Sequence, residues 1–273
     1  MPFTVSHAVV AFAARRTPLP VAAVAVGAMA PDAVLFVPAL PPYTVAHSPF
    51  GIVTIDLVVA LVTLALWWVL VRPAWTPVLP APVRDRLPAD WARPPRLRWV
   101  DVPLVVVACV LGSVTHVVWD AFTHPHGRAV AVLPALRSAV AGHPVYAVVQ
   151  DCSSVAGLVT LGVAAVVWWK RTAPRADAGD VPDARRASRP AVLEARVAPA
   201  VAVAVVLLVA VVTAVRALLA GGGVGGIVVA EAFRLPAAVA VVLVVGAVVL
   251  RLRSGGGQRS GQPDGEERGE VRA

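Results

Sequence analysis

The sequence of 273 residues has little charge and few of the residues that build common active sites. Only 15% of its residues are charged, and it contains two cysteines and a single lysine, Lys170. Cys109 and Cys152 are too few for a disulfide framework or a thiolate metal site. The chain also lacks a glycine-rich phosphate loop, a Gly-x-Ser-x-Gly elbow and an HExxH pattern. Classes of enzyme that depend on these motifs are therefore excluded.

Apolar residues dominate instead. They make up 58% of the chain, and the mean hydropathy is +0.78. A transmembrane helix needs roughly 20 apolar residues. Four firm runs and a shorter fifth meet or approach this length, at about 51–71, 102–121, 146–169, 197–219 and 235–250. We therefore expect an all-α polytopic membrane protein with about 5–6 transmembrane helices, whose partner is the lipid bilayer.

A sixth apolar segment, 18–40, is broken by Pro31, Asp32, Pro38 and the pair Pro41–Pro42. It could span the membrane or re-enter it. We expect a membrane domain over 1–170, a basic cytoplasmic loop over 171–196, two further spans over 197–250 and a disordered cytoplasmic tail over 251–273. No cleavable signal peptide is expected, since no basic region precedes the first apolar run.

The 24 lysines and arginines orient these spans, because positive loops stay in the cytoplasm. Six arginines lie between 72 and 101, seven basic residues lie between 170 and 196, and five lie beyond 250. The loops 122–145 and 220–234 carry few. We predict a multi-pass protein of the cell membrane with a cytoplasmic C-terminus. Nucleic-acid binding is not expected, because the arginines are not interleaved with aromatic residues.

The stretch "THVVWDAFTH" (115–124) carries the clearest chemical signal. His116, Asp120 and His124 follow one another at intervals of four, so they lie along one face of a helix. A single histidine at a helix end is commonly an interfacial residue or a cap. Imidazole nitrogens and carboxylate oxygens together are ligands for a divalent metal, and zinc is the ion we expect.

Further polar residues lie beside the same ends of the predicted spans. Ionisable groups at the rim of a span are costly and therefore mark candidate functional sites. His7, Asp32 and His47 are candidate metal ligands. Their alternatives are an interfacial helix, a turn and a loop histidine, respectively. Asp56 and Asp151 could orient ligands or act as general base. The charge pattern places His47, His116, Asp120 and His124 at the outer face. For His7, Arg15 and Arg16 favour the cytoplasmic side, and only a re-entrant 18–40 would return it to the outer one.

Several short motifs resemble a known family. "MPFTVSH", "GAMAPD", "HSPFG" and "THVVWDAFTHPHG" followed by "LP" resemble bacterial integral membrane proteins classed as domain of unknown function 4184, over roughly residues 1–170. A fainter similarity is to predicted membrane-bound metal-dependent hydrolases and to the helical zinc phospholipase C and nuclease fold. This similarity implies a two- or three-metal site with these ligands: His7, Asp32, His47, His116, Asp120 and His124. The Glu that would complete a three-metal site, four residues after a later histidine, is absent.

These features favour a membrane metal-dependent hydrolase acting on a phosphoester or lipid at the outer face. The alternative is a small transporter or structural membrane protein whose His/Asp rim handles ions. A conduction path would need polar residues through the middle of the bilayer, whereas the centres of spans 51–71, 146–169 and 197–219 are almost entirely apolar. A third possibility, an anchor for a cytoplasmic partner, has no motif that supports it.

Overall fold

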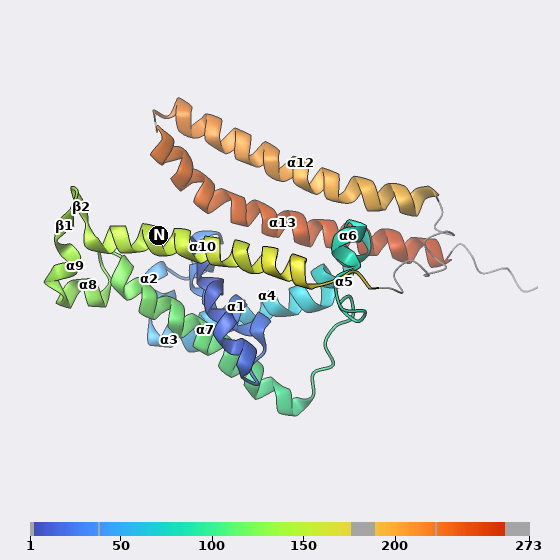
Figure 1. Cartoon of the computed structure of the whole chain (residues 1–273), viewed down its shortest axis with the longest axis horizontal. Coiled ribbons are helices and arrows are strands. Elements are labelled where there is room, and N and C mark those ends of the chain that lie inside the picture. Colours follow the sequence, from blue (N-terminus) through green and yellow to red (C-terminus); the bar gives the residue numbers. More distant parts are fainter. Residues whose placement is uncertain (1–2, 38, 176–188, 222, 260–273) are drawn as a thin grey trace, which may run out of the picture.

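The structure is a computed structural model, and it describes residues 3–37, 39–175, 189–221 and 223–259. Helices make up most of these residues (Figure 1). The expected all-α architecture is therefore confirmed. In the described part of the chain, five helices are long and apolar enough to cross a membrane: Pro49–Val78, Trp99–Val132, Val145–Arg171, Val197–Leu219 and Arg234–Arg253.

The N-terminal segment is built from short helices rather than one span. Prolines interrupt it repeatedly, and a helix cannot continue through the residue before a proline without strain. Its elements are η1 (Thr4–Arg16), α1 (Val21–Met29), η2 (Ala30–Leu35), α2 (Tyr43–Ala46) and α3 (Pro49–Gly51). The apolar helix Val21–Leu35 is shorter than a span requires.

The first long span changes its helical pitch along its length. It runs on from α3 through two π-helical segments, which are often found at functional sites. Its elements are η3 (Ile52–Asp56), α4 (Leu57–Ala65), η4 (Leu66–Val71), α5 (Arg72–Trp75) and η5 (Thr76–Val78). The short helix α6 (Ala81–Arg84) follows.

The central part of the chain contains two long helices joined by a compact connection. In that connection a two-stranded antiparallel hairpin pairs Ala139 with Pro144, and Ala141 and Gly142 adopt positive φ values of 49° and 81° in its turn. The elements are η6 (Trp99–Asp101), α7 (Val102–Thr123), α8 (Arg128–Val132), α9 (Pro134–Arg137), β1 (Ala139–Val140), β2 (His143–Pro144) and α10 (Val145–Arg171).

The last two helices, α12 (Arg189–Leu219) and α13 (Val224–Arg259), form a long hairpin (Figure 1). Helix α13 continues past the predicted end of the fifth span at residue 250. The rest of the predicted tail, 260–273, lies outside the described residues, as does 176–188 of the predicted basic loop. The hairpin is attached to the first span by Trp75, whose indole Nε1 donates to the Leu243 carbonyl at 2.8 Å.

Close packing of α1 against α7 forms the core near the site. A Cβ atom on Gly112 would lie 2.6 Å from the backbone nitrogen of Ala28, and one on Gly27 would lie 2.7 Å from Cα of Cys109. Only glycine allows the two backbones to approach so closely. The Ser113 hydroxyl donates to the Gly27 carbonyl at 3.0 Å across this contact. The close approach places the end of α1 directly beside His116.

Candidate metal centre

Six side chains from four elements, η1, η2, α2 and α7, gather at one end of the bundle, and we call them the His/Asp cluster. Asp32 and His116 are almost completely buried, with 1% and 0% of their surface exposed. His7 and Asp120 are also buried, while His47 and His124 are partly exposed. The structure thus brings together the six residues that the sequence suggested as ligands: His7, Asp32, His47, His116, Asp120 and His124. Whether they bind metal stays a prediction.

Prolines place three of these residues. Pro31 is the second residue of η2, and Asp32 follows it in the first turn. Pro42 precedes α2, whose C-cap is His47. Pro125 follows His124, which has left the helical conformation with φ −118° and ψ 146° and ends α7. The chain breaks that make the N-terminal segment irregular therefore also position its polar side chains.

Four cluster members form a compact group that could hold a metal ion. One ligand atom from each of Asp32, His47, His116 and Asp120 lies within 4.8 Å of the other three. The His116 Nε2 atom lies 3.3 Å from His47 Nε2, 3.3 Å from Asp120 Oδ2 and 3.5 Å from Asp32 Oδ1. His47 Nε2 lies 3.4 Å from Asp120 Oδ2 and 4.0 Å from Asp32 Oδ1. We call these residues the four-ligand group.

These separations match those of a tetrahedral zinc site. Ligands at about 2.0–2.1 Å from zinc in a tetrahedron lie about 3.3–3.4 Å from one another. Three of the five separations are 3.3 or 3.4 Å, and a fourth is 3.5 Å. The 4.0 Å separation of His47 Nε2 from Asp32 Oδ1 departs clearly from this value, and the sixth pair of ligand atoms, on Asp32 and Asp120, lies within 4.8 Å.

Backbone carbonyls fix the tautomers of both histidines in the four-ligand group. The His116 Nδ1–H donates to the Ala28 carbonyl at 2.8 Å, and the His47 Nδ1–H donates to the Tyr43 carbonyl at 3.1 Å. A carbonyl can only accept, so each Nδ1 carries the hydrogen and each neutral ring presents a lone pair on Nε2. Two such lone pairs only 3.3 Å apart repel, so either a proton on one Nε2 or a metal ion must lie between them. This tautomer is the one that metal-bound histidines adopt.

The two oxygens of Asp120 have different neighbours. Oδ2 belongs to the four-ligand group and also lies 3.5 Å from Nδ1 of His124. Oδ1 lies 3.7 Å from Nε2 of His7 and has no hydrogen-bond partner in the described part of the chain. The His7 ring stacks on that of His116, with 4.0 Å between ring centroids. His7 and His124 therefore flank the four-ligand group through Asp120.

Several buried polar atoms of this region lack a hydrogen-bond partner among the described residues. They include His7 Nε2, Asp32 Oδ1, Asp120 Oδ1 and His124 Nε2. Burying a polar atom without a partner costs about 1–3 kcal/mol, and more if the group is charged. Several such atoms side by side are therefore expensive unless a cation satisfies them together. The donor set fits a divalent ion.

Electrostatics outside the spans also suit metal binding. Burial lowers the pKa of His7 to about 4, so its imidazole is neutral at pH 7. Burial opposes ionisation of Asp32, but contact with His116 and the hydroxyl of Thr4 hold its pKa below the usual range. A neutral imidazole and an ionised carboxylate are the ligating forms of these side chains.

Two supporting residues, Thr4 and Tyr43, were missed in the sequence. The Thr4 hydroxyl donates to Asp32 Oδ2 at 2.7 Å, and the Tyr43 hydroxyl donates to Asp120 Oδ2 at 3.0 Å. The Tyr43 ring also stacks on His47, with 3.6 Å between ring centroids. Burial and Asp120 raise the pKa of the Tyr43 hydroxyl, which stays a donor. The spacing of Tyr43 four residues before His47 was the available signal.

The two residues suggested as orienters or general base differ sharply in position. Asp56 is fully buried at the end of η3, and it interacts electrostatically with His47, His116 and Asp32. Neither of its carboxylate oxygens has a hydrogen-bond partner among the described residues. Asp151 is exposed on α10, and no contact with the cluster is found for it in the described chain. A catalytic role for either residue stays a prediction. The position in the structure favours such a role for Asp56 and not for Asp151.

Comparison with known proteins adds the family. A family model described as "Domain of unknown function (DUF4184)" matches residues 1–252. The chain belongs to this family. The match extends well beyond residue 170, where we expected it to end, and so includes most of the α12–α13 hairpin. No curated protein and no solved structure matches the chain, so the fainter resemblance to metal-dependent hydrolases gains no support.

Proposed function

We propose that this protein binds a divalent metal ion, zinc in the first instance, in the four-ligand group and hydrolyses a phosphoester of a membrane lipid. The observation that carries the proposal is the set of 3.3–4.0 Å separations among the ligand atoms of His47, His116, Asp120 and Asp32. Partnerless buried atoms and the fixed tautomers support it. A bound divalent ion supplies Lewis-acid chemistry and lowers the pKa of water to about 7.

The protein's own groups have separate parts in this proposal. Asp32, His47, His116 and Asp120 hold the ion, while Tyr43 and the carbonyls of Ala28 and Tyr43 orient the ligands. Asp56 accepts the proton of the attacking water. The water oxygen bonds to phosphorus, the bond from phosphorus to the alcohol oxygen breaks, and the departing alcohol oxygen takes up the proton that Asp56 accepted.

Hydrolysis by the purified full-length protein in lipid nanodiscs tests this proposal. The probes are bis(p-nitrophenyl) phosphate and phosphatidylglycerol, assayed with added zinc and after chelation. We expect zinc-dependent release of p-nitrophenol or of a phosphate-bearing headgroup, abolished in Asp120→Asn and retained in the exposed controls Asp90→Asn and His143→Ala. If turnover is absent with zinc, or equal in Asp120→Asn and the wild type, the hydrolase proposal is wrong.

The outward orientation is also a proposal, supported by the basic loops. Cysteine labelling from outside intact cells tests it, in a background where the exposed native Cys152 is replaced by serine. We expect a cysteine at Gly223 to be modified and one at Ala92 to be protected. Modification of Ala92→Cys with protection of Gly223→Cys would place the site at the cytoplasmic face.

A further inference from the structure

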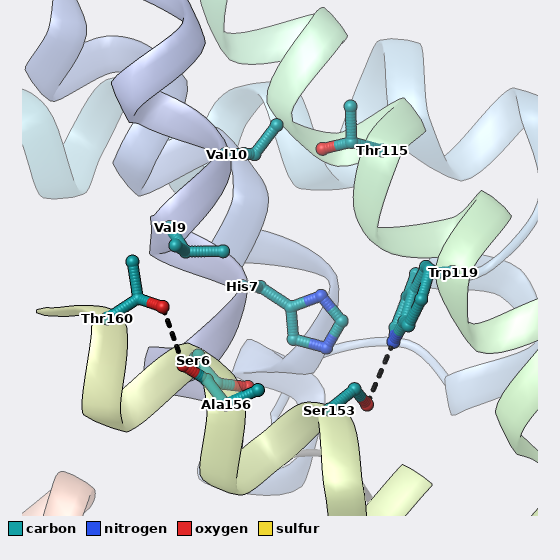
Figure 2. A pocket seen from close by; sticks show the side chains of 10 residues that line it. Ser6, His7, Val9, Val10, Thr115, Trp119, Ser153, Ala156 and Thr160 are labelled. Carbon is teal, nitrogen blue, oxygen red and sulfur yellow. Dashed lines mark hydrogen bonds between the residues drawn. The ribbon is translucent and has the colours of Figure 1, made fainter. Parts of the chain in front are cut away.

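A pocket of about 330 Å³ lies between η1, α7 and α10, beside the His/Asp cluster (Figure 2). Pockets that bind small molecules begin at about this size. Figure 2 shows the His7 ring in the middle of the lining, between η1 and Trp119. The other lining residues are Ser6, Val9, Val10, Thr115, Ser153, Ala156, Gly157 and Thr160.

His7 connects this pocket to the candidate metal centre. Its ring forms part of the pocket wall, and the same ring stacks on His116 at 4.0 Å. Its Nε2 atom lies 3.7 Å from Asp120 Oδ1. Only the His7 side chain therefore separates a molecule in the pocket from the four-ligand group.

The pocket opens sideways, toward the surroundings of two spanning helices. Thr115 and Trp119 on α7 and Ala156 and Thr160 on α10 are all exposed. The α10 residues lie 11 to 15 positions after its start at Val145, about 16–22 Å along the helix at 1.5 Å per residue. With the start of α10 at the membrane surface, as its length and composition suggest for a span, that depth lies within the hydrocarbon of a bilayer about 30 Å thick. The opening thus faces acyl chains rather than water.

The hydroxyl groups of the lining are already used. Ser6 donates to the Phe3 carbonyl, Thr115 to Gly112 and Thr160 to Ala156, at 2.7, 2.6 and 2.7 Å. Ser153 donates to the Gln150 carbonyl at 3.0 Å, and its oxygen accepts from the Trp119 indole at 3.2 Å. These groups have no spare hydrogen for a ligand. Apart from His7 and hydroxyl oxygens that can still accept, the pocket offers methyl, methylene and ring surfaces.

We propose that this pocket holds one acyl chain of a membrane phospholipid, which enters between α7 and α10 and places its phosphoester beside His7. The chain-binding part stands on the pocket itself. The placement of the phosphoester rests on the function proposed above and names the substrate class as an intact membrane phospholipid. Access from the side means that substrate reaches the site without leaving the bilayer.

Photocrosslinking tests the proposal. Full-length protein is reconstituted in nanodiscs containing phosphatidylglycerol with a diazirine on one acyl chain, irradiated and digested, and the labelled peptides are mapped. We expect labelling concentrated on residues 6–10 and 153–160. Ala156→Phe fills the pocket and should abolish this labelling. Val159→Phe, on the same helix but outside the lining and 57% exposed, should leave it intact.

Thr160→Phe serves as a second filling variant, and monodisperse elution confirms that each variant is folded. Even labelling of the exposed faces of all five spans, or labelling of 153–160 that survives both filling variants, would overturn the acyl-chain pocket. Metal content is measured on the same samples. Pocket labelling in a protein that binds no zinc would leave the acyl-chain pocket standing and remove the metal centre. Zinc binding with even labelling would leave the metal centre standing and remove the acyl-chain pocket.

Discussion

The two ends of the chain differ in helix regularity and in the number of polar residues that they bury. The α12–α13 hairpin consists of long helices, and Thr213 is the sole buried polar residue among its described side chains. The first 124 residues contain short 3₁₀, π and α segments and bury His7, Asp32, Asp56, His116 and Asp120. Polar groups at membrane depth need cover from protein. The irregular region covers its polar side chains with protein. The hairpin, which buries a single polar side chain among its described residues, does not need such cover.

Burial of the spans shows the same contrast. In the apolar window of Trp99–Val132, which carries His116 and Asp120, 33% of residues are buried, against 6% in each of the last two spans. The side chains of the hairpin are mostly exposed to the surroundings, whereas α7 packs against α1, η1 and the first long span. Substitutions and metal removal should therefore have large effects on zinc content and stability in the first region and small effects in the second.

Loss of a central ligand gives the largest expected difference between the regions. We expect His116→Ala to reduce bound zinc to background, because it removes a fully buried ligand that contacts three others. Thr213→Ala, the matched change in the hairpin, should leave zinc content unchanged. Elemental analysis of both purified variants checks this. Equal zinc in the two proteins would break the proposed link between the irregular region and metal binding.

Metal removal should loosen only one region. A ligand present at 1,000 times its dissociation constant stabilises the state that binds it by about 4 kcal/mol. Chelation should therefore speed hydrogen exchange in α1 and in residues 113–123 of α7 and leave residues 201–215 of α12 unchanged. Mass spectrometry of exchanged peptides measures this. A uniform rise across both regions would show that the ion stabilises the whole bundle.

Glycine substitutions should separate packed from open helix surfaces. Gly112→Ala forces a Cβ atom into the backbone of α1 and should destabilise the protein by about 1–3 kcal/mol. Gly162→Ala on α10 meets nothing within 4 Å and should be neutral or slightly stabilising. Thermal unfolding in detergent compares the two. A neutral Gly112→Ala would mean that α1 and α7 pack less closely than described.

Tyr43 offers the smallest and most specific change. Tyr43→Phe keeps the ring that stacks on His47 and removes the hydroxyl that donates to Asp120 Oδ2. Removal of such a supporting hydrogen bond weakens metal affinity by about 10–100-fold. Competition with a zinc chelator of known affinity measures it. Unchanged affinity would assign Tyr43 to packing alone.

The spans and the cluster differ in how far the sequence determines them. Hydropathy alone located the five spans, because each is a near-continuous apolar run. The spacing of His116, Asp120 and His124 also revealed one face of the site. The fold of 18–40 could not be read, since a proline-broken apolar run fits both a span and a re-entrant segment. Thr4 and Tyr43 escaped because their role depends on tertiary contacts with Asp32 and Asp120.

Asp151 shows the limit of reasoning from proximity in the sequence. It lies next to buried Gln150, at the expected end of its helix, yet its side chain is exposed away from the cluster. One residue along a helix rotates a side chain by about 100°, so neighbours in sequence can face protein and lipid. Asp56 also belongs to no recognisable motif in the sequence, yet its side chain is buried.

X-ray absorption at the zinc edge of the purified full-length protein tests the central claim most directly. The proposed centre predicts stoichiometric zinc with a first shell of nitrogen and oxygen ligands at about 2.0–2.1 Å and imidazole scattering from His47 and His116. A sulfur shell at about 2.3 Å, or protein that remains without zinc after incubation with the ion, would contradict it.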